Sequence, residues 1–98
     1  MTAAEVVAQL RAHRPALEAA GVRHAALFGS LARGEAGAAS DIDILIDIAP
    51  MPRFSVYDYA AIRETAAALF DAPVDVVARR YLRPEIAARA EADAVRAF

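Results

Sequence analysis

The strongest constraint on the fold is an eight-residue segment, DIDILIDI (residues 41–48), in which side-chain character alternates from one position to the next. Isoleucine occupies positions 42, 44, 46 and 48, whereas the intervening positions hold three aspartates and one leucine. A period of two is that of a β-strand, because successive side chains point to opposite faces of a sheet. We therefore expect a strand with an apolar face in the core and a largely acidic face outside it.

The remaining segments predict a small domain of mixed type. Further strands are expected at VRHAALFG (22–29) and VDVVAR (74–79), where short apolar runs are bounded by glycine or proline. Helical patterns cover TAAEVVAQLRAH (2–13), PALEAA (15–20), LARGEA (31–36), FSVYDYAAIRETAAALFDA (54–72) and RPEIAARAEADAVRAF (83–98). The predicted fold is one α/β (α+β) domain over residues 1–98, with a small mixed sheet of about three strands and helices mainly on the isoleucine side.

Helix boundaries carry their own signals. Thr2 with Glu5 three residues later forms a capping-box pattern, and Ser55 is the predicted N-cap of the helix that follows it. Gly21 and Pro73 are placed where helices should end. The final helix is rich in alanine, and the sequence leaves open whether its alanine face packs on this domain or on a partner.

Composition excludes several classes of protein. The chain has no cysteine, which removes disulfides, thiolate metal sites and cysteine nucleophiles, and which favours a cytoplasmic location. The net charge is −2, so no general basic face for nucleic acid is expected. The longest run without charged residues, 24–32, is far too short to span a bilayer, so no membrane partner is expected.

Asp41, Asp43 and Asp75 are the candidate catalytic residues. Asp41 and Asp43 are two positions apart on one strand, so their carboxylates leave the same face and repel each other. Asp75 follows the same alternation between two valines, and it joins the pair if its strand neighbours the first. Three carboxylates on one open face suit magnesium, with up to two ions. Each acid taken alone is equally compatible with a solvated position.

Gly29 and Ser30 supply the second half of the candidate site. They stand where the first strand ends, and ten residues separate Ser30 from Asp41. Glycine lets the backbone approach a phosphate, and serine there offers a hydroxyl and an N–H group. Arg33, one turn later, is a candidate donor to the same phosphates, although a lone surface arginine is commonplace.

The motifs resemble a known family. GSLARGEAGAASDID looks like the signature of the DNA polymerase β-like nucleotidyltransferase superfamily, and LFGSLARG, SDIDILID and VDVV resemble its minimal nucleotidyltransferase (MNT) domains. The resemblance implies the nucleotidyltransferase fold, ATP as substrate and magnesium as cofactor. It assigns Gly29 and Ser30 to the triphosphate, with Arg33 matching the family's Ala-Arg-Gly element, and it assigns Asp41, Asp43 and Asp75 to the metals.

The resemblance also implies a partner. Stand-alone MNT domains are commonly antitoxins of HEPN-type toxins, which suggests a hetero-oligomer and transfer of AMP to a toxin tyrosine. Two alternatives remain at this point. In the first alternative to AMP transfer, the domain is an antitoxin that neutralises its partner by binding alone. In the second, it is a transferase subunit that modifies RNA or a small molecule with the help of a separate substrate-binding chain.

Overall fold

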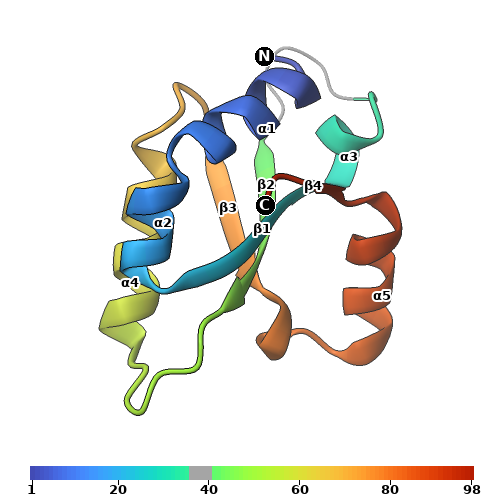
Figure 1. Cartoon of the computed structure of the whole chain (residues 1–98). Coiled ribbons are helices and arrows are strands. Elements are labelled where there is room, and N and C mark those ends of the chain that lie inside the picture. The colour runs from blue at the N-terminus through green and yellow to red at the C-terminus, as the bar shows by residue number, and fades with distance from the viewer. Residues whose placement is uncertain (36–40) are drawn as a thin grey trace.

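The computed structural model describes residues 1–35 and 41–98, which form a twisted sheet with helices on both sides (Figure 1). Its elements are α1 (Ala3–Ala12), α2 (Arg14–Ala20), β1 (Val22–Phe28), α3 (Gly29–Ala32), β2 (Ile42–Ile48), α4 (Val56–Ala67), β3 (Val74–Ala78), a 3-10 turn (Arg79–Tyr81), α5 (Pro84–Asp93) and β4 (Val95–Arg96). The strand order is β3-β2-β1-β4. β1 runs antiparallel to β2 and β4, whereas β2 and β3 are parallel. The predicted mixed α/β sheet is confirmed, with one strand more than expected.

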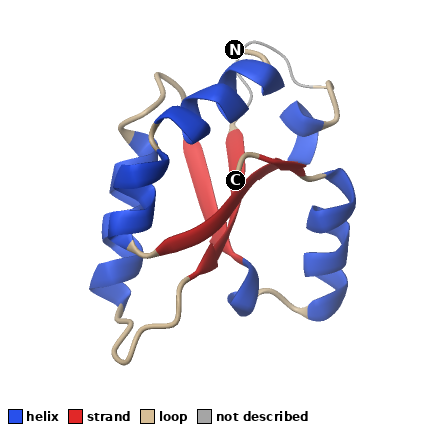
Figure 2. Cartoon of the chain, viewed as in Figure 1, coloured by secondary structure: helices blue, strands red, loops and turns tan. Residues whose placement is uncertain are grey.

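The two faces of the sheet differ in what covers them. The isoleucine face packs against α1, α2 and α4, which lie together on one side of the sheet (Figure 2). Its side chains at positions 42, 44, 46 and 48 are buried in the main core. The opposite face carries Asp43, Leu45 and Asp47 of β2 together with Asp75 of β3; we call it the carboxylate face. α5 lies on this second side. The prediction that helices gather mainly on the isoleucine side is therefore confirmed.

Local sequence explains where most helices begin. The Thr2 side chain accepts a hydrogen bond from the Glu5 N–H, and the Glu5 carboxylate accepts one from the Thr2 N–H, which is the predicted capping box. Ser55 caps α4 through the same reciprocal pair with Asp58. Gly21 ends α2 in the left-handed region at φ 111°.

Three predicted boundaries were wrong. Residues 94–98 were assigned to the last helix, but α5 ends at Asp93 and β4 follows, because pairing with β1 outweighs the helical preference of the alanines. Arg11 fixes this segment by donating to the Ala97 carbonyl at 2.7 Å. The short helix begins at Gly29 rather than residue 31 and is four residues long. α4 ends at Ala67, five residues earlier than predicted.

The alanine face of the last helix packs in part on this domain. Ala90 is buried, whereas Ala88 and Ala92 on the same helix are exposed. Ala26 and Leu45 are buried on the carboxylate face, outside the main core cluster. α5 therefore contributes a small second apolar cluster, and most of its surface remains open.

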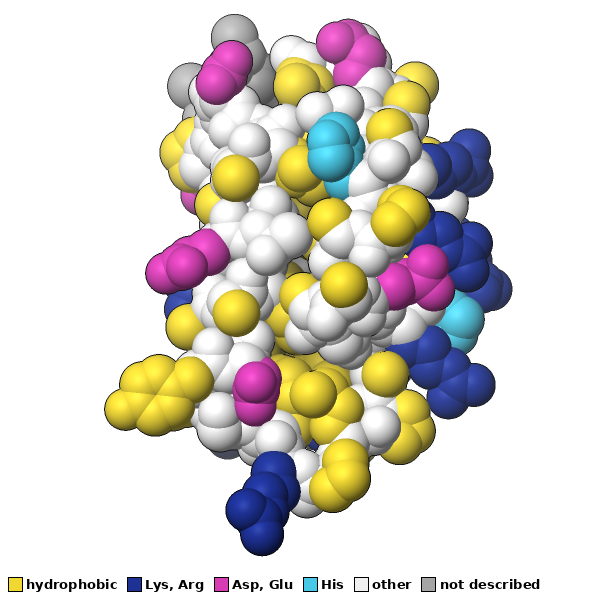
Figure 3. All heavy atoms as spheres, turned by 60° about the vertical axis from the view of Figure 1, so that its left-hand side comes forward, with side chains coloured by type: hydrophobic (Ala, Val, Ile, Leu, Met, Phe, Trp, Pro, Cys, Tyr) yellow, Lys and Arg dark blue, Asp and Glu magenta, His cyan; other side chains and the backbone are white. Residues whose placement is uncertain are grey.

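The tyrosines divide between structural and exposed positions. The Tyr59 hydroxyl donates to the Val76 carbonyl at 2.7 Å, which ties α4 to β3. Tyr57 and Tyr81 are largely exposed, at 83% and 62%. Figure 3, with the α2 and α4 side turned forward, shows hydrophobic side chains gathered toward the end where α4 begins. None of the helices in the described ranges is long and apolar enough to cross a membrane.

Candidate active site on the carboxylate face

Strand pairing brings the predicted acids to one end of the sheet, at the start of β2 and β3. In the parallel register of β2 and β3, Asp43 lies directly beside Asp75. Asp41 immediately precedes β2, and the next residue, Ile42, donates its N–H to the Pro73 carbonyl at 2.9 Å. The requirement that the strand of Asp75 neighbour that of Asp41 is thus met. The described structure places the three carboxylates at the start of two adjacent strands.

Gly29 is fitted against the central carboxylate. Asp43 pairs with Phe28 across β1 and β2, so the residue after Phe28 reaches the same level of the sheet. Gly29 has a φ of 77°, and a Cβ placed there would overlap the Asp43 carboxylate, with the Asp43 Cγ only 3.2 Å away. Both the backbone conformation and the lack of space require glycine. Gly29 therefore joins the Gly-Ser turn to the acidic cluster.

Ser30 lies in the first turn of α3, next to Gly29. Its side chain is half-buried, and its carbonyl accepts a hydrogen bond from the Glu35 N–H at 3.0 Å. Within the part of the chain that the structure describes, no hydrogen bond engages the Ser30 hydroxyl. Ser30 directly follows Gly29, which abuts the Asp43 carboxylate.

Arg33 stands near the acids but is held by two other carboxylates. Its Nε donates to Glu35 at 3.0 Å, and its Nη1 donates to Asp93 of α5 at 2.9 Å. These two hydrogen bonds raise the pKa of the Arg33 guanidinium above its usual value. Arg33 also stabilises the ionised form of Asp43 at longer range. A phosphate that recruits Arg33 has to compete with Glu35 and Asp93.

The electrostatics of the cluster centre on Asp43. The pKa of its carboxyl is raised above the usual value, first by partial burial and then by the charges of Asp75 and Asp41, against a smaller lowering by Arg33. Ionising all three acids together is therefore unfavourable without a positive charge between them. A cation of charge two would remove that cost.

The donor set fits magnesium better than a closed metal centre. Carboxylate oxygens are the hard ligands that this ion prefers, and it keeps part of its shell for water and phosphate. Across residues 1–35 and 41–98, no three acidic or histidine side chains already converge as a metal-binding group. His13 and His24 take no part, since His13 contacts the Gln9 carbonyl and His24 contacts Arg96. Asp41, Asp43 and Asp75 are the residues that could hold the ion.

Two ion pairs on the same face could not be predicted from local patterns. Arg79, just after β3, bonds Asp47 of β2 at 2.8 Å and also pairs with Glu91 of α5. Together with the bond from Arg33 to Asp93, this fastens α5 over the carboxylate face at two points.

Fold and site together define a class of α/β domain that places a Gly-Ser turn against strand-borne carboxylates, an arrangement suited to nucleotide phosphates. The family model for the nucleotidyltransferase domain matches residues 10–96, and the chain belongs to this family. The sequence-based identification, and the expectation of a nucleotidyltransferase, are thereby confirmed.

Individual relatives agree with this assignment. The chain is 39% identical over 88 residues to the protein adenylyltransferase MntA of Thermococcus cleftensis, covering 89% of this chain and 87% of that protein. Its fold is similar to a structure described as a minimal nucleotidyltransferase, with a TM-score of 0.70, 29% identity, and coverage of 97% of this chain and 95% of the other. A toxin-antitoxin structure with AMP-PNP shares the fold at a TM-score of 0.69 and 20% identity, covering 100% of this chain and 73% of the other.

Proposed function

We propose that this domain transfers AMP from ATP to a hydroxyl group of a partner protein, a tyrosine of a HEPN-type toxin, and thereby acts as an antitoxin in the cytoplasm. The observation that carries the proposal is the meeting of Asp43, Asp75 and Gly29 at one end of the sheet. The similarity to a protein adenylyltransferase supports AMP as the group transferred. The toxin-antitoxin structure with AMP-PNP, which shares the fold, motivates the choice of partner.

Each side chain has a distinct task in this proposal. The Gly29 backbone and the Ser30 hydroxyl hold the β- and γ-phosphates, and Arg33 joins them after release from its surface partners. Asp41 and Asp43 hold the magnesium ions, and Asp75 completes the ligand set on the neighbouring strand. When bound, magnesium neutralises phosphate charge and lowers the pKa of the acceptor hydroxyl.

The reaction balances as a single displacement. The acceptor oxygen forms a bond to the α-phosphorus of ATP, and the bond from that phosphorus to the oxygen bridging the α- and β-phosphates breaks, so that this oxygen leaves as part of pyrophosphate. The hydroxyl proton leaves to solvent, and Gly29 and Ser30 hold the departing pyrophosphate. The preorganised donors of Gly29 and Ser30 act where negative charge develops on the departing pyrophosphate, and electrostatic stabilisation of this kind is usually the largest single contribution to catalysis.

The test compares neutralisation by matched variants in cells that express the proposed HEPN-type toxin partner. The double variant Asp41→Asn, Asp43→Asn should lose neutralisation, and the toxin should lack the added mass of AMP. Glu64→Gln removes an exposed carboxylate from α4 on the opposite side of the sheet and should behave as the unmutated protein. Full neutralisation by the double variant would establish the binding-only antitoxin instead. Label appearing on RNA or a small molecule would redirect the acceptor.

A further inference from the structure

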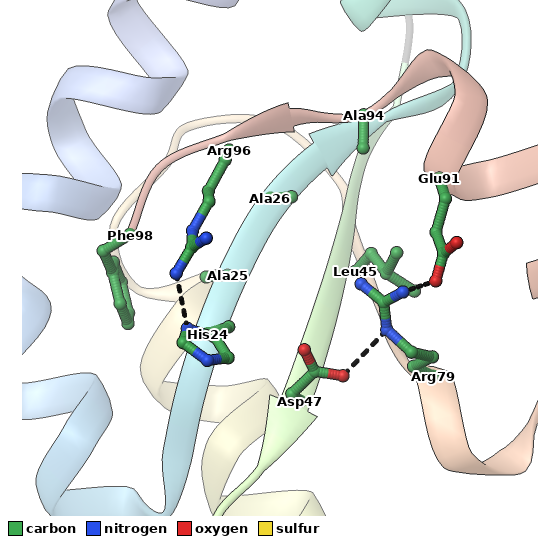
Figure 4. A pocket seen from close by; sticks show the side chains of 10 residues that line it. All are labelled: His24, Ala25, Ala26, Leu45, Asp47, Arg79, Glu91, Ala94, Arg96 and Phe98. Atoms are coloured by element: carbon green, nitrogen blue, oxygen red, sulfur yellow. Dashed lines mark hydrogen bonds and ion pairs between the residues drawn. The ribbon is translucent and has the colours of Figure 1, made fainter.

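A pocket beneath α5 opens on the carboxylate face, next to the acids. It has a volume of about 280 Å³ and is lined by residues from β1, β2, β4, α5 and the 3-10 turn (Figure 4). We propose that this pocket receives the nucleoside of the nucleotide substrate and so decides which nucleotide is used. The proposal rests on the proposed nucleotidyl transfer and adds a binding site to it.

The pairing of β1 with β2 places the pocket about one nucleoside's length from Asp43 along the sheet. Leu45 follows Asp43 by two residues on the same face of β2, a step of roughly 6.6 Å along a strand. Ala26 of β1 pairs with Leu45, and both line the pocket. Gly29 lies on the other side of Asp43, at the end of β1. A nucleotide with its outer phosphates at Gly29 and its α-phosphate at Asp43 thus has its nucleoside beside the pocket.

The size of the pocket suits part of a nucleotide. Ligand pockets commonly measure about 300–1,000 Å³, so a volume near 280 Å³ has room for a nucleoside but not for a whole nucleoside triphosphate. Its apolar lining includes Ala26, Leu45 and Ala94, of which the first two form the buried floor and Ala94 is half-buried. The small side chains leave the space that a ring needs.

The polar lining offers acceptors for sugar hydroxyls. Figure 4 shows Arg79 reaching between Asp47 and Glu91, with an ion pair to each. The bond from Arg79 uses the Asp47 Oδ1, and an ionised carboxylate has further lone pairs for O–H donors. Arg79 holds both carboxylates in place at the rim of the pocket through these ion pairs. This pairing of an apolar floor with carboxylates at the rim is suited to ribose and a base.

The test separates the nucleoside from the phosphates by comparing ATP with inorganic tripolyphosphate, each bound in the presence of magnesium. Ala94→Leu fills the pocket from a half-buried position at the end of α5, and Ala92→Leu adds the same atoms to an exposed position on that helix. Ala94→Leu should weaken ATP binding about tenfold, which corresponds to about 1.4 kcal/mol, and leave tripolyphosphate within about twofold. Ala92→Leu should change neither.

A second variant guards against a folding defect. Glu91→Gln keeps the shape of the side chain and should reduce the preference for ATP over 2′-deoxy-ATP without changing tripolyphosphate binding. Unchanged ATP binding in a folded Ala94→Leu protein, or equal losses for ATP and tripolyphosphate, would overturn the pocket assignment. Failure of the unmutated protein to bind either compound would instead overturn the proposed nucleotidyl transfer, together with the pocket that depends on it.

Discussion

The two faces of the sheet are built by the same strands but in different ways. On the isoleucine face, α1, α2 and α4 seal a continuous apolar core that includes Ile44, which is 1% exposed. On the carboxylate face, Asp43 is half-buried with a raised pKa, and α5 is fastened by ion pairs with little apolar burial. Adjacent residues of β2 therefore have different roles, with Ile44 in the core and Asp43 in the candidate site. One face stabilises the fold, and the other stores unfavourable charge that a ligand can relieve.

The largest expected effect is a loss of nucleotidyl transfer when the carboxylate face is changed. Asp43→Asn removes the central acid of the cluster and should lower nucleotidyl transfer by at least about 10³-fold, since metal-assisted charge stabilisation supplies several kcal/mol. Steady-state rates with labelled ATP and the purified partner measure the loss. Activity within tenfold of the unmutated protein would remove Asp43 from the catalytic machinery.

The same substitution should not cost stability at neutral pH. The folded state raises the pKa of Asp43, so it binds the proton more tightly than the unfolded state. Without magnesium, the free energy of unfolding therefore falls as pH rises from the unfolded pKa through the raised folded value. Asp43→Asn should unfold at a higher temperature than the unmutated protein at pH 7, and the difference should shrink as acid protonates the carboxyl. A lower melting temperature for the variant at pH 7 would contradict the assigned electrostatics.

A substitution of Ile44, the residue next to Asp43, should lower stability and leave nucleotidyl transfer unchanged. Ile44→Ala leaves a cavity in the main core and should cost about 2–5 kcal/mol of the free energy of unfolding. Denaturant unfolding measures the loss, and transfer rates at a temperature where the variant stays folded should match those of the unmutated protein. A large fall in kcat for the folded variant would show that the two faces are not separable.

The Gly-Ser turn allows a finer comparison, because Gly29 and Gly34 have nearly the same left-handed φ angle. Gly29 has a φ of 77° and abuts Asp43, whereas Gly34 has a φ of 75° with open space around it. Alanine at either position should cost about 1–2 kcal/mol for the left-handed backbone. Displacement of the Asp43 carboxylate should lower kcat by about 10²-fold for Gly29→Ala alone. Equal activities of the two variants would contradict the claim that Gly29 is required to keep the Asp43 carboxylate in position.

The smallest expected effect concerns the fastening of α5. Asp93→Asn removes one of the two acids that hold Arg33, an exposed pair of a kind that contributes about 0–1 kcal/mol. Arg33 then becomes easier for phosphate to recruit, so the KM for ATP should fall by roughly 2–5-fold with kcat unchanged. Glu85→Gln, at the other end of α5, is the matched control. A raised KM in Asp93→Asn would mean that Asp93 supports the site rather than competing for Arg33.

The sequence predicted the features that are local in the chain. The alternation around Asp43 fixed a strand and its two faces, and the capping pairs located the starts of α1 and α4. β4 escaped prediction because two residues after an alanine-rich helix become a strand only by pairing with β1, about 70 residues earlier in the chain. The start of α3 was misplaced because Gly29 itself opens the helix.

The candidate site shows the same division. Asp41 and Asp43 are recognisable from spacing, whereas the position of Asp75 depends on the parallel pairing of β2 with β3. The contact between Arg33 and Asp93 spans 60 residues and has no local signature. Residues that act through long-range contacts, including those that line the pocket under α5, become visible only when the strands and helices are placed in space.

The most direct test asks which phosphate of ATP becomes attached to the partner protein. The purified protein is incubated with its partner, magnesium and ATP labelled on either the α- or the γ-phosphate, in parallel with Asp41→Asn, Asp43→Asn. The account predicts that the α-label alone becomes bound covalently to the partner, and that the double variant transfers none. Transfer of the γ-label, or α-label transfer that survives in the double variant, would contradict the claim that the carboxylate face is a nucleotidyltransferase site.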